Sequence, residues 1–391
     1  MGSRAFARRV EQLLRDQGLS MRAVSRKMIY DPAYLCRVLA GKQAPSRQFA
    51  EALGHVLNAT GELVALATAS EQAGPPTFSD APLRISGTRG AGFAHAIRET
   101  SQQLVALDNG PLGVPVAEPA VRAYRIVRKR LEDADYDPRY ERDIRAAAAE
   151  LAEVAGWVLF DAELHSAARR ANQEALTLAR SSGDTCMERL IQQNAAMCCE
   201  WVGNHREALA ITQGVLERGR LAPRVEAIFR VREAKAMAGV GRTTEAVRAL
   251  SAARSLLDDG TRDDDPYWAW WVTPGEVEGH LGHVLQEAGR TAKAIDVFQT
   301  VVNRPVTTTV GHAGMSDARL LQCLLREQAW QDADQLLQQV MAAIQTRSSK
   351  RVRTTLWRTA EHGRTLTDAP SSLRDALAHL ADVTDADLFG F

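Results

Sequence analysis

The sequence predicts an all-α protein, with a short helical domain at its N-terminus followed by a longer solenoid of helix pairs. Three observations predict this class. Apolar residues recur at helical spacing along most of the 391 residues, no segment alternates strictly for long enough to indicate a sheet, and one helix-pair pattern recurs five times. The composition, 45% hydrophobic and 25% charged, is that of an ordinary globular protein.

Composition divides the chain into three zones. Residues 1–70 have a helical pattern, residues 71–92 are rich in Gly, Pro, Ser and Thr without an apolar period, and residues 93–391 are helical again. We therefore expect a small domain over 1–70, a linker over 71–92 and a repeat domain over 93–391.

Charge is distributed unevenly between these zones. The 48 basic and 48 acidic residues cancel over the whole chain, but residues 1–70 hold ten basic and five acidic side chains. The small domain therefore carries a formal charge of +5 and the remainder a formal charge of −5. A basic domain on a mildly acidic body is typical of a protein that contacts nucleic-acid phosphates with one end.

Several classes of protein are disfavoured. No apolar run approaches the ~18 residues that cross a bilayer, and the charged start MGSRAFARRVEQLL lacks the apolar core of a secretory signal. Five cysteines without a C-x-x-C pair argue against a disulfide framework and a zinc ribbon. We expect a reduced cytoplasmic protein with no membrane partner, no bound metal and no cofactor. Because the common nucleotide-binding, zinc-protease and nucleophile motifs are absent, we also expect no catalytic residues and no enzymatic activity.

The long zone contains five similar segments, each following another helix. Every segment has a short turn, then an alanine, then an amphipathic helix. A small residue at this point lets the second helix cross the first closely. The matching alanines are Ala167, Ala208, Ala246, Ala294 and Ala333. The pattern resembles the tetratricopeptide repeat, which implies that the pairs stack into a curved solenoid with a concave groove, and a degenerate sixth pair is expected at 350–380.

Two short helices separated by a turn are predicted within residues 19–41. Ser20 is a good N-cap for the first helix. Asp31 caps the second helix, Pro32 occupies its first position, and Gly41 ends it. Apolar residues upstream mark one further helix, and those downstream mark two more. The small domain is therefore expected to contain five helices.

This five-helix pattern resembles the lambda-repressor-like, or XRE-type, helix-turn-helix domain over roughly residues 4–69. The order of Leu19, Ser25, Leu35 and Gly41 fits the pattern of that family. The resemblance implies that the second helix of the motif presents its N-terminal end to the major groove of duplex DNA.

The resemblance also indicates which side chains contact DNA. Arg37, on the outward face, is suited to a bidentate contact with guanine. Pro32 and Ala33 are short and apolar, as packing against a thymine methyl requires, and Tyr34 is placed for a base edge or a phosphate. Residues flanking this helix are expected on phosphates, which fix position without reading sequence. They are Arg22, Lys42, Gln43 and Arg47.

Residues 93–184 extend the resemblance to most of the chain. Their segments are similar to actinobacterial regulators that join an XRE-type domain to tetratricopeptide-like repeats, and more distantly to the peptide-sensing quorum regulators. This implies a homodimeric, sequence-specific transcriptional regulator on an inverted-repeat operator, with a peptide or small-molecule signal in the repeat groove. A protein-interaction scaffold and a groove-regulated enzyme are the alternatives.

Candidates for contacts in the groove stand on the first helices of the pairs. Amide side chains can satisfy a peptide backbone and aromatic side chains can anchor its side chains. For the tryptophans, among them Trp157, packing between repeats is the competing interpretation. The candidate ligand-binding residues are Gln193, Asn194, Trp201, Trp271 and His283.

Overall fold

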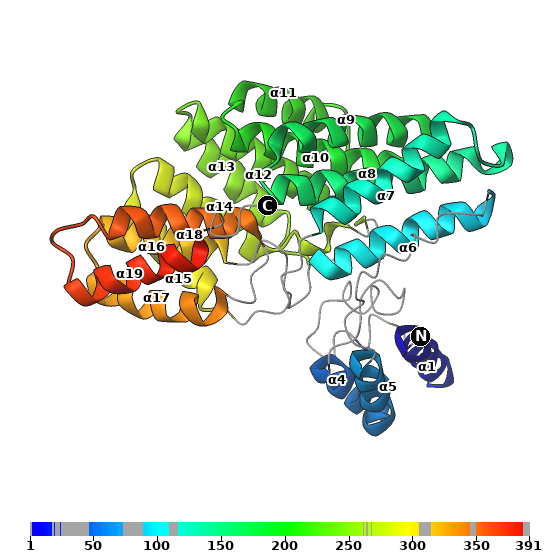
Figure 1. The fold of residues 1–391 in the computed structure, drawn as a ribbon, viewed down its shortest axis with the longest axis horizontal. Coiled ribbons are helices and arrows are strands. Elements are labelled where there is room, and N and C mark those ends of the chain that lie inside the picture. Colours follow the sequence, from blue (N-terminus) through cyan, green and yellow to red (C-terminus); the bar gives the residue numbers. More distant parts are fainter. Residues whose placement is uncertain are drawn as a thin grey trace. The chain divides into compact units, whose positions relative to one another are not determined.

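The chain folds into helices that form two compact units, Met1–Ser86 and Gly87–Phe391, each described here by itself (Figure 1). No strand occurs in the part of the chain that the computed structural model describes, so the all-α prediction is confirmed. No helix within these ranges combines the length and apolar character needed to span a membrane. The described residues are 2–17, 19, 24, 47–72, 89–108, 116–260, 262, 265–266, 268–304, 314–344 and 349–385.

The first unit contains three described helices around a small apolar core. They are α1 (Gly2–Asp16), α4 (Arg47–Leu57) and α5 (Thr60–Gln72). Phe6 of α1 packs against Phe49 of α4, and both rings are fully buried. Arg9 donates hydrogen bonds of 2.7 and 3.0 Å to the two carboxylate oxygens of Glu62, which ties α1 to α5.

The predicted helix-turn-helix segment lies largely outside the described residues. Within 19–41 only Leu19 and Val24 are described, and Val24 is helical and fully buried. Helix α5 extends to Gln72 and the next helix begins at Ala91, so both ends of the segment expected as a linker are helical.

The second unit is a stack of helix pairs preceded by α6 (Ala91–Asp108), α7 (Ala117–Glu132) and the short helix η1 (Pro138–Tyr140). Six pairs follow, including the degenerate one expected near the C-terminus. They are α8 (Glu141–Asp161) with α9 (His165–Ser182), α10 (Thr185–Trp201) with α11 (His205–Leu216), α12 (Pro223–Gly239) with α13 (Thr243–Ser255), α14 (Pro274–Glu287) with α15 (Thr291–Val302), α16 (Met315–Arg326) with α17 (Trp330–Ala343), and α18 (Lys350–Gly363) with α19 (Ser371–Thr384). Helix η2 (Ala269–Trp271) precedes α14.

The turns of the first five pairs share one geometry. A residue with positive φ stands five positions before a fully buried alanine at each helix crossing. Three of the positive-φ residues are glycines, which adopt this conformation without steric cost. The turn residues are Glu163, Gly203, Gly241, Gly289 and Gln328, and the alanines are Ala168, Ala208, Ala246, Ala294 and Ala333.

The prediction of Ala167 for the first of these crossings is wrong by one position. Ala168 is fully buried, whereas Ala167 is only partly buried. His165 and His205 each begin the second helix of their pair, and three residues further on lie Ala168 and Ala208. Aligning the two histidines gives the correct register.

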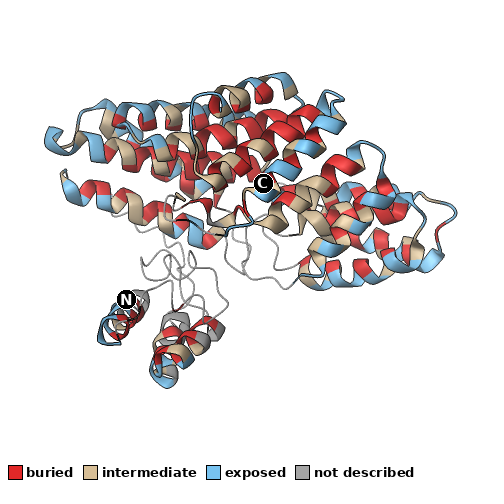
Figure 2. Cartoon of the chain, turned by 180° about the vertical axis from the view of Figure 1, so that it is seen from behind, coloured by how far each residue is buried: buried red, intermediate tan, exposed pale blue. Residues whose placement is uncertain are grey.

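The first helices of the central pairs form the core of this unit. Helices α8, α10 and α12 are buried along most of their length (Figure 2), as expected of helices covered on all sides. Charged side chains interrupt the apolar pattern of these buried helices. They are Glu153, Glu200, Arg232 and Lys235.

Candidate functional site

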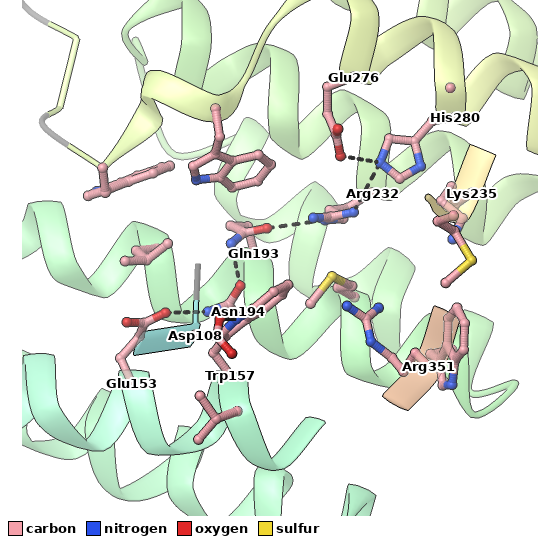
Figure 3. A pocket seen from close by; sticks show the side chains of 18 of the residues that line it. Asp108, Glu153, Trp157, Gln193, Asn194, Arg232, Lys235, Glu276, His280 and Arg351 are labelled. Atoms are coloured by element: carbon pink, nitrogen blue, oxygen red, sulfur yellow. Dashed lines mark hydrogen bonds and ion pairs between the residues drawn. The ribbon is translucent and has the colours of Figure 1, made fainter. Parts of the chain in front are cut away.

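The first helices of the pairs surround a cavity of about 270 Å³ in the second unit. Side chains from α6, α8, α10, α12, α14, α16 and α18 line it, together with two tryptophans around η2. Figure 3 shows its polar side chains approaching from opposite helices. The volume is close to the lower end of the range for small-molecule pockets, which starts at ~300 Å³.

A chain of hydrogen bonds crosses the cavity wall through four consecutive first helices (Figure 3). Asn194 Nδ2 donates to Glu153 Oε1 at 2.7 Å, and Gln193 Nε2 donates to Asn194 Oδ1 at 2.5 Å. Arg232 Nε then donates to Gln193 Oε1 at 3.1 Å. His280 continues the chain, because its Nε2 lies 3.5 Å from Arg232 Nη1 and 3.3 Å from a Glu276 carboxylate oxygen.

Four cations line the same cavity. Lys235 Nζ lies 2.7 Å from Glu200 Oε2, and Arg351 Nε lies 2.9 Å from Asp161 Oδ1. Arg232 has the partners already given, and Arg319 Nη1 donates to Gln286 Oε1 at 3.2 Å. Lys235 and Arg351 are therefore ion-paired, whereas Arg232 and Arg319 contact amide or imidazole groups. The four cations are Arg232, Lys235, Arg319 and Arg351.

Aromatic side chains form the apolar part of the wall. Trp157 donates its Nε1–H to Asp108 Oδ2 at 3.1 Å. Trp201 packs edge-on against Phe160, with ring centroids 5.9 Å apart. The Arg351 guanidinium carbon lies 4.3 Å from the Phe160 ring centroid and 5.3 Å from those of both tryptophans. Cation–π contacts of this kind hold the guanidinium against the wall.

Tryptophans around η2 complete the wall on another side. Trp268 is buried and donates its Nε1–H to the carbonyl oxygen of Cys186 at 3.1 Å. Trp271 also lines the cavity. Arg224 Nε lies 3.2 Å from Asp265 Oδ2, and this ion pair anchors the loop that leads into η2.

Burial shifts the protonation of the lining groups toward neutral forms. It raises the pKa of Glu153 to about 8, although the Asn194 hydrogen bond opposes the shift. It lowers the pKa of His280 to about 4 and that of His283 well below its ordinary value. It also lowers the pKa of Arg232 and Lys235. Near pH 7 both histidines are therefore neutral, and Glu153 is mostly protonated.

All five residues predicted to line the groove belong to the cavity lining. They are Gln193, Asn194, Trp201, Trp271 and His283. Whether any of them contacts a ligand stays a prediction. His283 Nε2 lies 2.8 Å from a carboxylate oxygen of Glu287, so part of its hydrogen-bonding capacity is used within the protein. In the described residues, no group of three His, Cys, Asp or Glu side chains is arranged to hold a metal ion.

The side chains predicted to contact DNA are not among those that the structure describes. The backbone of Arg47 begins α4, but its side chain is not described. The other seven, Arg22, Pro32, Ala33, Tyr34, Arg37, Lys42 and Gln43, fall wholly outside the described residues. Their roles stay predictions.

Sequence reasoning missed the charged part of the cavity. Arg232 and Lys235 stand three positions apart in VREAKAMAG, on a helix whose apolar pattern continues around them. Glu153 stands likewise within LAEVAGWVLF. A charge at a core position is rarely buried without a reason. This signal, available in the sequence, could have identified all three.

Comparisons with known proteins found one family model and similar solved structures. Residues 5–67 match the family model described as a helix-turn-helix domain. No curated protein matches the chain. Among solved structures, the chain is similar to a crystal structure of a Rap protein complexed with competence and sporulation factor, with 10% sequence identity and a TM-score of 0.48 over 74% of this chain and 87% of that one.

Proposed function

We propose that this chain is a cytoplasmic transcriptional regulator of the XRE type that binds DNA sequence-specifically as a homodimer. The observation that carries the proposal is the match of residues 5–67 to a helix-turn-helix domain, in the zone with a formal charge of +5. Positive charge on such a domain favours binding to duplex phosphates and makes that binding strongly salt-dependent. In this proposal Arg37 reads a base, and the flanking basic residues contact phosphates.

The second unit supplies the signal site in this proposal. Its cavity combines hydrogen-bonding groups, cations and tryptophans, which is the composition of a ligand pocket. The occupant is a peptide or a small molecule, and the proposal assigns no catalytic step to it. A ligand changes DNA binding only if it binds one state of the dimer better than another.

Arg351 offers a physical route for such a preference. It lines the cavity, and it also joins α18 to Asp161 at the end of α8. A ligand that contacts Arg351 therefore competes with, or reinforces, the contact that holds the first and last helix pairs together. Occupancy and the shape of the second unit are coupled in this way.

Selection of duplexes from a random pool by the full chain tests the DNA-binding half. The proposal predicts enrichment of an inverted repeat, whose half-sites lie one helical turn or a multiple of it apart. Light scattering of the complex should give two chains per duplex. A folded chain that enriches no duplex at low ionic strength would refute the proposal, and enrichment of a single half-site by one chain would refute the homodimer.

A further inference from the structure

Two arginines in the cavity wall have no carboxylate as a direct partner. Arg232 is 4% exposed, and its contacts are the Gln193 amide oxygen and the His280 ring. Arg319 donates to the amide oxygen of Gln286. In the described part of the chain, neither guanidinium forms an ion pair within 4.0 Å. Arg232 is buried and Arg319 is partly buried. A guanidinium bonded only to neutral groups lacks the hydrogen-bonded anion that ordinarily compensates the desolvation of a cation.

Arg351 has one unsatisfied hydrogen-bond donor. Its Nε is engaged by Asp161, but its Nη2 is buried and has no hydrogen-bond partner. Buried donors without a partner are uncommon in folded proteins and call for an explanation, such as an ion or ligand. Arg351 comes from α18, whereas Arg232 and Arg319 come from α12 and α16, so arginines of three helices line one cavity.

These cations lie close enough to repel one another. Burial is the main cause of the lowered pKa of Lys235, Glu200 opposes it, and the charges of Arg319 and Arg232 lower the pKa further. For Arg232 burial again comes first, the charges of Glu276 and Glu200 oppose it, and the charge of Arg351 adds to it. An anion placed among them would relieve the repulsion and accept hydrogen bonds from the donors that have no carboxylate partner.

Among the described residues, no carboxylate that lines the cavity forms a direct ion pair with Arg232, Arg319 or Arg351. Burial raises the pKa of Glu153 to about 8, so this group is mostly neutral near pH 7. Glu276 faces His280, and Asp108 accepts a hydrogen bond from Trp157. Glu200 is matched one-to-one with Lys235 at 2.7 Å. The charges of Glu276, Glu200 and Glu287 act on Arg232 and Arg319 without a direct contact among the described residues. Asp161 engages only Nε of Arg351 and leaves its Nη2 without a partner.

The size and lining of the cavity limit which anion can bind beside these arginines. The cavity of about 270 Å³ lies near the lower end of the range for small-molecule pockets, which starts at ~300 Å³, and this favours a small occupant. Trp157, Trp201 and Trp271 offer flat apolar faces for the remainder of such a molecule.

We propose that the cavity binds a small organic monocarboxylate, with its carboxylate against Arg232, Arg319 and Arg351 and its apolar body against the tryptophans. The carboxylate matches the planar fork of a guanidinium group. A single negative charge suits a cluster that already has Glu276 at one edge. The further step, that this carboxylate is the regulatory signal, rests on the proposed function.

Titration calorimetry of the full chain with matched acid and amide probes tests the inference. The probes are phenylacetate, indole-3-acetate and hexanoate, each compared with its own primary amide, which has nearly the same shape but no charge. We expect at least one acid to bind ten-fold or more tightly than its amide, because charge-assisted hydrogen bonds are the stronger ones. The inference is overturned if no acid binds better than its amide, or if phenyl phosphate or an extended pentapeptide binds more tightly than every acid.

Variants on one helix separate the cavity from general charge effects. Arg319→Gln should reduce the preference for acid over amide at least ten-fold, whereas Arg326→Gln, an exposed position on the same helix α16, should leave it unchanged. Arg232→Gln provides a second test if Arg319→Gln does not fold. An unchanged preference in a folded Arg319→Gln or Arg232→Gln chain contradicts the assignment. Because these titrations contain no DNA, their outcome is independent of whether the chain binds a duplex.

Discussion

Arg351 and Asp161 are separated by 190 residues in the chain, yet Arg351 Nε donates a 2.9 Å hydrogen bond to Asp161 Oδ1. Ser349 Oγ donates to the same oxygen at 2.8 Å. One helical turn away, Thr354 Oγ1 donates to Glu163 Oε2 at 2.7 Å. Together these contacts join the start of the last helix pair to the first turn of the solenoid, and they place Arg351 in the wall of the cavity.

Breaking this junction should destabilise the second unit. Arg351→Met leaves Asp161 buried without its cation, and removal of one partner from a buried pair costs about 3–5 kcal/mol. Urea unfolding followed by tryptophan fluorescence measures the loss. Arg358→Met, an exposed position on the same helix, is the matched control and should stay within about 0.5 kcal/mol of the unmodified chain. Equal stability of the two variants would mean that the junction contributes nothing.

Glu153 should make stability depend on pH in the neutral to alkaline range. Because burial raises its pKa from 4.5 to about 8, the folded chain binds more protons than the unfolded chain between these values. The stabilisation is fully present below pH 4.5 and is lost as the pH rises through about 8. Glu153→Gln keeps an acceptor for Asn194 and removes the charge, so we expect its stability to fall less between pH 5.5 and 9.

Denaturant unfolding at several pH values measures this difference. Each pKa unit corresponds to ~1.4 kcal/mol, so the advantage of Glu153→Gln at pH 9 should reach a few kcal/mol. Exposed Glu217→Gln serves as the control and should reproduce the pH profile of the unmodified chain. Parallel profiles for Glu153→Gln and the unmodified chain would show that this carboxyl is not desolvated.

Two helical glycines should respond oppositely to alanine. A Cβ at Gly282 of α14 would lie 2.6 Å from the ring of fully buried Phe298 of α15, and overpacking of this kind costs typically 1–3 kcal/mol. A Cβ at Gly214 of α11 would meet no atom within 4 Å, so Gly214→Ala should stabilise by about 0.5–1 kcal/mol through helix propensity. Thermal unfolding compares the two variants, and a melting temperature raised by Gly282→Ala would contradict the close crossing of these helices.

The helix pairs were predictable because their signal is local. Turn glycines such as Gly203 and Gly241, and alanines such as Ala208, recur at fixed offsets within each pair. The single error in register, Ala167 for Ala168, arose at a turn where Glu163 replaces glycine at the positive-φ position. Gln328 also replaces glycine at the fifth turn, where Ala333 was predicted correctly. The first turn differs in that two adjacent alanines follow it, Ala167 and Ala168, and local sequence does not distinguish them.

The cavity was only partly predictable, for a different reason. Its amide residues and Trp157 and Trp201 stand on first helices, and this placement follows from the repeat pattern. Trp271, predicted on a first helix, lies instead in η2, which precedes α14. Arg351 joins them from the last pair, and its position depends on how far the whole stack curves. Curvature accumulates from small rotations at every interface between pairs, and no local pattern reports it. The contact between Arg351 and Asp161 was therefore visible only in the structure.

The ratio of specific to non-specific DNA affinity in the Arg37→Ala chain tests the central claim most directly. Fluorescence anisotropy of the full chain on the selected duplex and on a scrambled duplex, at fixed salt, gives this ratio. If Arg37 reads a base, the variant should lose roughly 1–3 kcal/mol of preference for the selected duplex and keep most of its affinity for the scrambled one. Equal losses on both duplexes, or no binding of either by the folded chain, would contradict the account.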